Sequence, residues 1–555
     1  MTTAETEFSY ATHEVTNQPT PLDSYNLFGS DRALRDGVAR EGAESAERDL
    51  TAFGELLGKP ETIQLGFDAN RILPELHTHD RYGFRIDEVR YQSAYHELMR
   101  IGVEAGVHAE PWRNPGRGAH VARLAKHFML SQIESGVGCP LTMTFAAVPS
   151  LRHQPEVAET WVPRLLSDSY DPSFQPAGDK QGALMGMAMT EKQGGSDVRA
   201  NTTRAVPVNA GGPGQPHLLT GHKWFCSAPM CDAFLTLAQT EAGLSCFLVP
   251  RWLPDKTRNR FYIQRLKDKL GNRSNASSEI EYRDTWAVMI GEEGRGVPTI
   301  IEMVNHTRLD CIAGSASLMR QALAQAIHHA SQRSAFGKRL IEQPLMLRVL
   351  ADLAIETEAA TAVMLRLARA YDEGPDNAEA RAFSRIGTAA SKYWVCKRGP
   401  GMVYEALECL GGAGYVEESI MPRLFRESPL CSIWEGSGNV MCLDVLRAAT
   451  KDPETVPAFF NEVEKARGGN TALDAHLDAL KALVGDPSMG VEEARRLVQM
   501  MALALQAALL VQHAPTAVAD AFCGSRLGGE SGLTYGVLPR GVDAKAIVER
   551  AAPQG

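Results

Sequence analysis

Long apolar runs are scarce in this sequence. The longest extends from Leu497 to Val511, and Gln499 and Gln506 interrupt it. A transmembrane helix needs about 20 predominantly apolar residues, so this stretch predicts a buried helix and not a membrane span. The polar start MTTAETEFSYATHEVT contains no apolar signal segment, and we therefore expect a protein that is not secreted.

Cysteine is sparse and without pattern. The 10 cysteines are scattered over 555 residues, and no two of them form a C-x-x-C pair. Disulfide frameworks and structural zinc sites use regular short spacings. We therefore expect reduced thiols, no metal site and a cytoplasmic protein.

An excess of positive charge is also missing. The chain has 57 Lys and Arg against 67 Asp and Glu, a net charge of −10. This balance excludes a globally basic surface of the kind that binds nucleic acid. The 44% hydrophobic and 22% charged residues are typical of a globular protein, which excludes a disordered or collagen-like chain.

The hydrophobic pattern changes along the chain from helical to β-type and back. Helical spacing, as at Ala94, Leu98 and Ile101, gives way near Leu184 to six short β-type runs that end near Gly294. Long helices are then expected at 298–333, 344–372 and 377–410. We predict an α+β fold with an N-terminal arm that has no core of its own and that a partner subunit could order (1–30), an N-terminal helical domain (31–182), a barrel-like middle β-domain (183–295), a C-terminal helical domain (296–450) and an additional helical region (451–555).

Two segments of the β-region combine glycine, hydroxyl and aromatic residues. MAMTEKQGGSD ends a β-run at Thr190 and leads through two glycines to Ser196. GHKWFCS places the aromatic Phe225 two residues before a serine. Such residues suit the face and polar edge of a planar ring. Taken singly, the first segment is better explained as a hairpin loop and the second as a half-buried strand.

Two further segments follow long helical runs. RSAFGKRL places Arg333 three residues before Phe336, a pair that can bind a phosphate and stack on a base. ECLGGAGY, at residues 408–415, is a glycine-rich turn whose amides could contact a diphosphate. The alternative for each is an ordinary helix C-terminus.

The segment IWEGSGN places an acid beside a large aromatic. Glu435 follows Trp434 and precedes a glycine-rich turn. An apolar neighbour raises the pKa of a carboxyl group and suits it to proton abstraction. The alternative is a solvated or helix-capping glutamate.

The order of these motifs in an α-β-α chain resembles the acyl-CoA dehydrogenase family over about residues 31–450. TEKQGGSD, RSAFGK, LGGAGY and IWEGSGN resemble the family's T-E-P-x-x-G-S-D, R-x-x-F-G-K, G-G-x-G-Y and I-Y-E-G-T-x-Q. KLGNRSNAS, at 269–277, resembles K-x-G-x-R-x-S-x-T, with Asn275 and Ser277 as departures. EKQGGSD, GHKWF, FGKRLIEQPLM and WEGSGN, with the tail past residue 450, are most similar to the AidB branch, which is linked to the bacterial alkylation response.

The resemblance implies FAD, held non-covalently between the β-domain and the helices that follow it. Phe225 stands in place of a tryptophan, Glu408 in place of a glutamine, and Gln343–Pro344 in place of a histidine–glutamine pair. The residues implied as cofactor-binding are Met187, Met189, Thr190, Gly195, Ser196, Phe225, Cys226, Ser227, Arg333, Phe336, Gly412, Ile433, Trp434, Gly436, Ser437, Gly438 and Asn439.

The resemblance also implies a catalytic role for Glu435, as the base that removes the α-proton of an acyl thioester. Some relatives place the base just before the arginine that matches Arg308, but Thr307 stands there. A dimer or a homotetramer built as a dimer of dimers is implied because the adenosine half of the cofactor reaches a neighbouring subunit, and we expect the tetramer.

Three functions stay open at this point. They are an acyl-CoA dehydrogenase with full turnover, an AidB-like flavoprotein with weak activity on a substrate such as isovaleryl-CoA that binds DNA or protects it from alkylation, and a flavin oxidase or monooxygenase of small nitrogenous compounds. We favour the second. Residues 451–555 carry 10 Lys and Arg against 13 Asp and Glu, so any DNA contact there needs a local patch such as Arg495 and Arg496.

Overall fold

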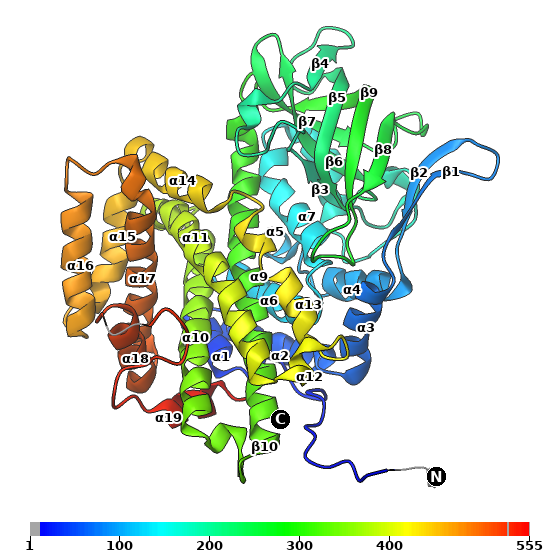
Figure 1. Cartoon of the computed structure of the whole chain (residues 1–555). Coiled ribbons are helices and arrows are strands. Elements are labelled where there is room, and N and C mark those ends of the chain that lie inside the picture. Colours follow the sequence, from blue (N-terminus) through cyan, green and yellow to red (C-terminus); the bar gives the residue numbers. More distant parts are fainter. Residues whose placement is uncertain (1–11, 530–531, 554–555) are drawn as a thin grey trace.

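The computed structural model describes residues 12–529 and 532–553. Three parts are distinct in Figure 1: a β-domain at the top, long helices at the centre, and an added helical region at one side. One hydrophobic core joins the N-terminal, central and added helices, and a second core fills the β-domain. The α+β architecture is the predicted one.

The N-terminal domain is helical, as predicted, except for one hairpin. Its helices are α1 (Arg32–Arg40), α2 (Glu47–Leu57), α3 (Pro60–Arg71), α4 (Ser93–Glu104), α5 (Glu110–Arg113), α6 (Ala119–Ile133), α7 (Gly138–Leu151) and α8 (Pro155–Leu165). Strands β1 (Glu75–His79) and β2 (Arg85–Arg90) pair antiparallel and project from the body (Figure 1). Their short, mostly polar sequences carry no strand signal, so this hairpin was not predicted.

The middle domain contains a seven-stranded sheet. Its strands are β3 (Met185–Ala188), β4 (Arg204–Pro207), β5 (Pro216–Ser227), β6 (Ala233–Thr240), β7 (Gly243–Pro250), β8 (Phe261–Leu266) and β9 (Ser277–Ile290). The order is β3-β6-β4-β5-β9-β7, with β8 paired to β9 and β7 paired back to β6. This last pairing closes a barrel-like ring. Six strands match the predicted runs, and the four-residue β4 was missed.

Three long helices form the centre of the molecule. They are α9 (Gly296–Gln332), α10 (Pro344–Glu373) and α11 (Ala378–Cys409), and their ends lie within two residues of the predicted ones. The short helices α12 (Gly412–Tyr415) and α13 (Met421–Glu427) follow, and α14 (Gly438–Lys451) completes the domain. At about 1.5 Å per residue, the 37-residue α9 is about 55 Å long. It extends from the β-domain to the opposite end of the molecule, where β10 (Ser334–Ala335) and β11 (Lys338–Arg339) form a small hairpin (Figure 1).

The added region packs closely on the central helices. It consists of α15 (Thr455–Val463), α16 (Thr471–Val484), α17 (Ala494–His513), α18 (Thr516–Arg526) and α19 (Ala544–Ala551). The stretch Val491–His513 is long and apolar enough to span a membrane, but 72% of its most apolar window is buried inside the protein. It is the buried helix predicted from the sequence. The pair Arg366–Glu462, with Nε–Oε1 at 2.6 Å, ties the region to α10.

The described part of the N-terminal arm packs against its own chain. Leu27 and Phe28 belong to the main core. Thr20 donates its backbone N–H to Gln332 Oε1 (2.9 Å), and Arg333 donates to the carbonyl of Asn17. From about residue 17 onward the arm is therefore ordered by its own chain: it contributes side chains to the main core and forms no separate core. Residues 1–11 lie outside the described residues.

Candidate active site

Glu435 lies on the loop between the 3₁₀ turn Leu430–Ser432 and α14. Its backbone is in the left-handed region, at φ +57°, a conformation that costs free energy in any residue except glycine. Gly436 follows at φ +105°, where a side chain would be strained, and Ser437 then occupies the N-cap position of α14. This glycine-assisted turn aims the Glu435 side chain at α9.

Two residues of α9 contact the loop. The hydroxyl of Thr307 donates to Oε2 of Glu435 (2.8 Å), and Nε of Arg308 donates to the Glu435 backbone carbonyl (3.0 Å). Arg308 is itself held by Asp444 on α14, at 2.8 Å. The structure therefore joins Glu435 to the position where some relatives carry their base.

The carboxyl of Glu435 is in a low-dielectric environment. Burial raises its pKa above the ordinary value, while the Thr307 hydrogen bond and the charges of Lys392 and Arg308 oppose this rise. Trp434 packs against the core of the β-domain, and its indole N–H is buried without a partner. The raised pKa agrees in direction with the one expected from the sequence, and the role of Glu435 as the base stays a prediction.

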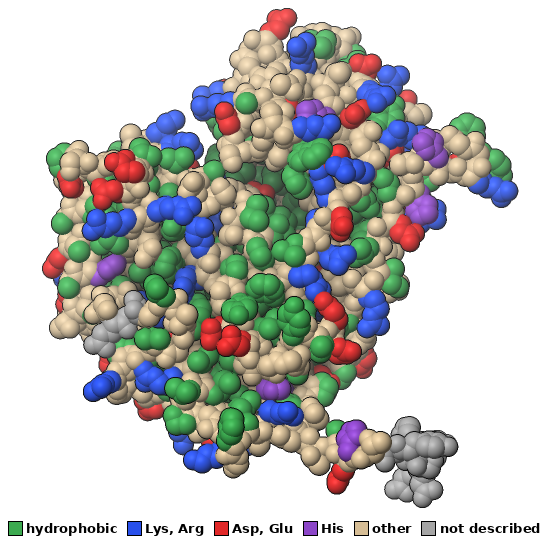
Figure 2. Space-filling view, viewed as in Figure 1, with side chains coloured by type: hydrophobic (Ala, Val, Ile, Leu, Met, Phe, Trp, Pro, Cys, Tyr) green, Lys and Arg blue, Asp and Glu red, His purple; other side chains and the backbone are tan. Residues whose placement is uncertain are grey.

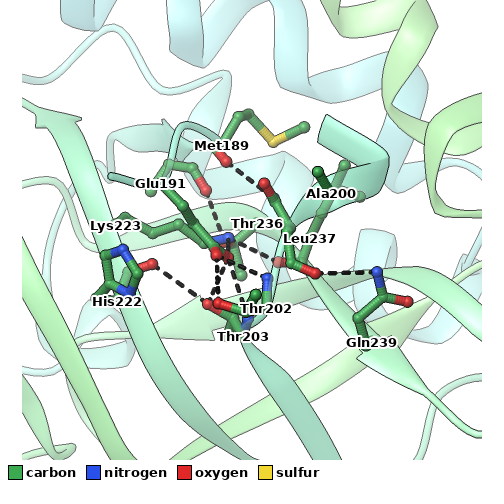
Figure 3. A network of polar contacts seen from close by, with 12 residues as sticks. Met189, Glu191, Ala200, Thr202, Thr203, His222, Lys223, Thr236, Leu237 and Gln239 are labelled. Atoms are coloured by element: carbon green, nitrogen blue, oxygen red, sulfur yellow. Dashed lines mark hydrogen bonds and ion pairs between the residues drawn. The ribbon is translucent and has the colours of Figure 1, made fainter. Parts of the chain in front are cut away.

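The segment that follows β3 is anchored by a buried ion pair (Figure 3). Glu191 and Lys223 lie 2.8 Å apart (Oε1–Nζ), and both side chains are fully buried. The carboxylate of Glu191 also accepts from the backbone and hydroxyl groups of Thr202 and Thr203. Burial alone would raise the pKa of Glu191, but the Lys223 charge and these donors hold it well below its usual range.

This anchor fixes the loop that carries the predicted flavin contacts. The backbone carbonyl of Thr190 accepts from the backbone N–H of Trp224 on β5 (2.7 Å). A Cβ at Gly195 would lie only 2.4 Å from Thr190 Oγ1, so the loop can fold back only with glycine there. Ser196, beyond it, is exposed.

A groove separates the β-domain from the helices. Figure 2 shows the surface hollowed below the β-domain, with hydrophobic side chains in the hollow. Met187 on β3 is partly buried against the β-domain core, as is the nearby Met189, and Phe225 on β5 is 48% exposed. The Cys226 side chain, by contrast, is fully buried in that core, so its predicted contact with the cofactor is wrong for the side chain. Alternation along β5 explains this, since neighbouring side chains face opposite ways.

The loop at 267–277 joins the same region. Lys269 donates to the carbonyl of Asn275 (2.6 Å) and to the Ser277 hydroxyl (3.1 Å), and Ser277 lies 3.2 Å from Ser227, Oγ to Oγ. The side-chain amide of Asn275 is buried, and neither its oxygen nor its nitrogen has a partner.

These features fit the flavin that the resemblance implies. A half-exposed aromatic ring, hydroxyl groups and two buried polar groups without partners suit a planar ring with a polar edge. At the start of α14, Ser437, Gly438 and Asn439 offer a helix N-terminus, where phosphates bind. Asn439 Oδ1 accepts from Nε of Arg495 (2.7 Å), so the added region reaches this point. Ile433 is largely exposed.

Three predicted contacts are not brought to this site within one chain. Arg333 and Phe336 lie at the far end of α9 (Figure 1), and the Phe336 side chain is fully exposed. Gly412 begins the short helix α12, and a Cβ there would meet nothing within 4 Å.

Two residues that hold the site were not predicted. Asp444 binds Arg308, and Lys392 binds the backbone of the Glu435 loop. Neither belongs to a recognisable motif. Asp444 could have been suspected because it lies nine residues after Glu435, on the helix that follows. Nothing in the sequence around Lys392 indicates its role.

Comparison with known proteins agrees with this geometry. The chain matches the adaptive response protein AidB N-terminal domain over residues 17–172, the acyl-CoA dehydrogenase middle domain over 186–285 and the acyl-CoA dehydrogenase C-terminal domain over 294–450. AidB of Escherichia coli (strain K12) is 45% identical over 526 residues, 94% of this chain and 96% of that protein.

Two comparisons with nematode proteins give the same family. Acyl-CoA dehydrogenase family member 11 of Caenorhabditis elegans is 31% identical over 477 residues, 82% of this chain and 75% of that protein. The crystal structure of C. elegans ACDH-11 in complex with C11-CoA superposes with a TM-score of 0.84 at 27% identity and covers 100% of this chain and 95% of that one. With three matching domains and near-complete coverage by AidB, this chain belongs to the acyl-CoA dehydrogenase family and to its AidB type.

Proposed function

We propose that this protein oxidises the Cα–Cβ bond of an acyl-CoA with Glu435 as the base. Family membership makes it an FAD-dependent oxidoreductase acting on CH–CH bonds. The observation that carries the assignment to Glu435 is its partly buried carboxyl, held on a left-handed turn and hydrogen-bonded to Thr307.

The chemistry follows from this placement. The bond between Cα and its hydrogen breaks, and the proton passes to a carboxylate oxygen of Glu435. The electron pair left on Cα forms the double bond as a hydride leaves Cβ, for which FAD supplies the acceptor when bound. Burial raises the pKa of Glu435 and so makes its carboxylate a stronger base. Thr307 keeps one carboxylate oxygen in place.

A short branched acyl chain, as in isovaleryl-CoA, is the substrate class that we propose. His306, next to Thr307 on α9, packs against Trp112 and Tyr371, with ring centroids 5.4 and 4.9 Å apart. Phe145 adds a fourth ring to this cluster. These rings fill space beside Thr307 and favour a short acyl chain. ACDH-11 was crystallised with C11-CoA, so long chains belong among the substrates tested.

A homotetramer is proposed for the active form. Arg333 and Phe336 lie at the end of α9 opposite to the β-domain, and Phe336 presents its whole ring to solvent. These residues can complete a cofactor site only on another subunit.

A weak affinity for duplex DNA and a role against alkylation are proposed by kinship with AidB. The added region is net negative. Arg495 is engaged by Asn439, and Arg496 pairs with Glu493 at 3.3 Å. These contacts argue for loose, charge-driven binding and against a specific site. We also propose a cytoplasmic location.

Anaerobic flavin bleaching tests the dehydrogenase proposal. The FAD-loaded protein is mixed with isovaleryl-CoA, butyryl-CoA and C11-CoA, and absorbance of the oxidised flavin is followed. Bleaching by at least one acyl-CoA, fastest with isovaleryl-CoA, is expected. If no acyl-CoA bleaches the flavin but a small nitroalkane or amine does, the dehydrogenase proposal is wrong and the flavin oxidase alternative takes its place.

A further inference from the structure

Lys392 lies on α11, and its ammonium group is hydrogen-bonded to the backbone of the segment that carries Glu435. Only 1% of the residue is exposed. Its Nζ donates to three backbone carbonyls, those of Cys431 (3.0 Å), Trp434 (2.9 Å) and Gly436 (2.7 Å). A lysine ammonium has three hydrogens to donate, so each of them has one acceptor on this loop.

The bonds hold the backbone on both sides of the left-handed residue. The carbonyls of Trp434 and Gly436 accept from Lys392, and the carbonyl between them, that of Glu435, accepts from Arg308 (3.0 Å). Three consecutive carbonyls are thus fixed by two buried cations. Because a left-handed glutamate is unfavourable on its own, these bonds supply what keeps the turn in place.

The charge of Lys392 lacks a direct counter-ion. Arg308 shares Asp444 with Arg385, each at 2.8 Å. In the described parts of the chain, no Asp or Glu forms an ion pair with Lys392. A buried ammonium without a paired carboxylate is costly, and the Glu435 carboxylate is the anion that its field reaches.

We propose that Lys392 is a positioning residue for Glu435, which holds the left-handed turn and supplies the positive charge that keeps the carboxyl ionised. This inference rests on the proposed role of Glu435 as the base. Lys392 does not touch the substrate in this account; it acts through the loop.

The other groups facing Glu435 do not duplicate this role. Thr307 supplies a neutral hydrogen bond. Arg308, which is bound to Asp444, lowers the pKa of Glu435 less than Lys392 does. The thiol of Cys139, on α7, is neutral near pH 7 because burial raises its pKa to about 12. Removal of the Lys392 charge should therefore raise the pKa of Glu435.

The experiment compares Lys392→Met, Lys392→Arg and the matched control Lys545→Met, which changes an exposed lysine of α19. The first readout is the pH dependence of flavin reduction by acyl-CoA. We expect the acid limb of Lys392→Met to move up by about one pH unit, while Lys392→Arg stays within about 0.3 unit of wild type because it keeps the charge.

The second readout needs neither FAD nor turnover. Hydrogen–deuterium exchange of the backbone amides of residues 433–437 is measured on the apoprotein. We expect exchange at least about tenfold faster in Lys392→Met, because the three carbonyl bonds are lost. Lys545→Met should exchange like wild type, and circular dichroism checks that each variant is folded.

The outcomes separate this inference from the proposed function. Lys392→Met behaving like Lys545→Met in either readout overturns the positioning role. If Lys392→Met does not fold, Lys392→Arg decides: faster exchange with an unmoved acid limb supports the role, and a moved limb or unchanged exchange refutes it. If wild type is not reduced by any acyl-CoA, the dehydrogenase proposal fails, and the exchange measurement still decides whether Lys392 holds the loop.

Discussion

The hydroxyl oxygen of Thr307 lies 2.8 Å from Oε2 of Glu435 and also 2.8 Å from the carbonyl oxygen of Val304. A hydroxyl group has one hydrogen and two lone pairs. While Glu435 is ionised, that hydrogen can serve only one of the two acceptors. Once Glu435 has taken a proton, the carboxylic acid can donate to Thr307, which in turn donates to Val304. Thr307 can therefore accommodate the base before and after proton transfer.

Replacement of Thr307 by valine should move the acid limb of flavin reduction to higher pH. The hydroxyl lowers the pKa of Glu435 by hydrogen bonding, so its loss raises that pKa and decreases the ionised fraction at a given pH. A hydrogen bond to a charged group contributes about 1.5–3 kcal/mol, and about 1.36 kcal/mol corresponds to one pKa unit, so an upward shift of about one to two units is expected. Thr307→Ser is the matched control and should keep the wild-type profile; a profile unchanged in Thr307→Val contradicts the argument.

Glu435→Gln should retain FAD but lose reduction by acyl-CoA. The amide is nearly isosteric, so the turn and the cofactor groove persist while the base is removed. Loss of a general base decreases rates by about 10²–10⁴-fold. Stopped-flow bleaching measures the rate, and the visible flavin spectrum after gel filtration checks retention. Bleaching at the wild-type rate would show that another residue takes the proton.

Lys223→Met should destabilise the β-domain strongly. The change leaves the Glu191 carboxylate buried without its cation, and breaking a buried ion pair in this way costs about 3–5 kcal/mol. Urea unfolding gives the free energy. The control is Lys256→Met, which breaks an exposed pair with Asp179, 64% and 43% exposed, and should cost no more than about 1 kcal/mol. Equal losses in the two variants would rule out a special role for the buried pair.

The same pair predicts a dependence on pH. The folded-state pKa of Glu191 is depressed, so its contribution to stability is complete above the unfolded value of about 4.3 and is lost as the pH falls through the folded value. In Lys223→Met the unpaired carboxyl is protonated more readily. The difference in unfolding free energy between wild type and variant should therefore narrow as the pH is lowered from 7 to 4.

Repeated periodicity explains which elements could be predicted. The 3.6-residue pattern recurs many times in α9, α10 and α11, and Pro344 marks one boundary, so these helices were predicted to within two residues. Strand β4 has only four residues, three of them exposed. Such a segment has too few alternations to show a period.

The same reasoning explains which residues of the site could be predicted from the sequence. Glu435 could be found because IWEGSGN is contiguous and matches a family motif. Lys392 could not, because its partners are backbone carbonyls 39, 42 and 44 residues away, and a carbonyl has no sequence signature. For Cys226, strand alternation places the side chain in the β-domain core, opposite Phe225 and Ser227, so the predicted contact can involve only its backbone.

Sedimentation should show an assembly larger than the 60.4 kDa chain. The reason is that Arg333 and Phe336 are remote from the β-domain in one chain. Arg333→Ala should lower FAD affinity, measured by flavin fluorescence after ultrafiltration. Arg339→Ala, in the adjacent strand β11 and paired with the neighbouring Glu342, should leave the affinity unchanged. A monomer with full FAD occupancy would contradict the proposed tetramer.

Binding to duplex DNA should be weak, independent of sequence and strongly dependent on salt. Phosphate contacts require clustered cations, and non-specific binding has a Kd of about 10⁻⁴–10⁻⁶ M at physiological salt. The added region carries fewer cations than anions. Of its two adjacent arginines, Arg495 contacts Asn439 and Arg496 pairs with Glu493.

Fluorescence anisotropy with two unrelated duplexes across a salt series measures the affinity for DNA. Arg496→Ala removes a largely exposed cation without touching Asn439, and it should weaken any binding at low salt by a few-fold. Tight binding to one duplex with little salt dependence would refute the charge argument, and no binding at low salt would leave acyl-CoA oxidation as the protein's sole proposed activity.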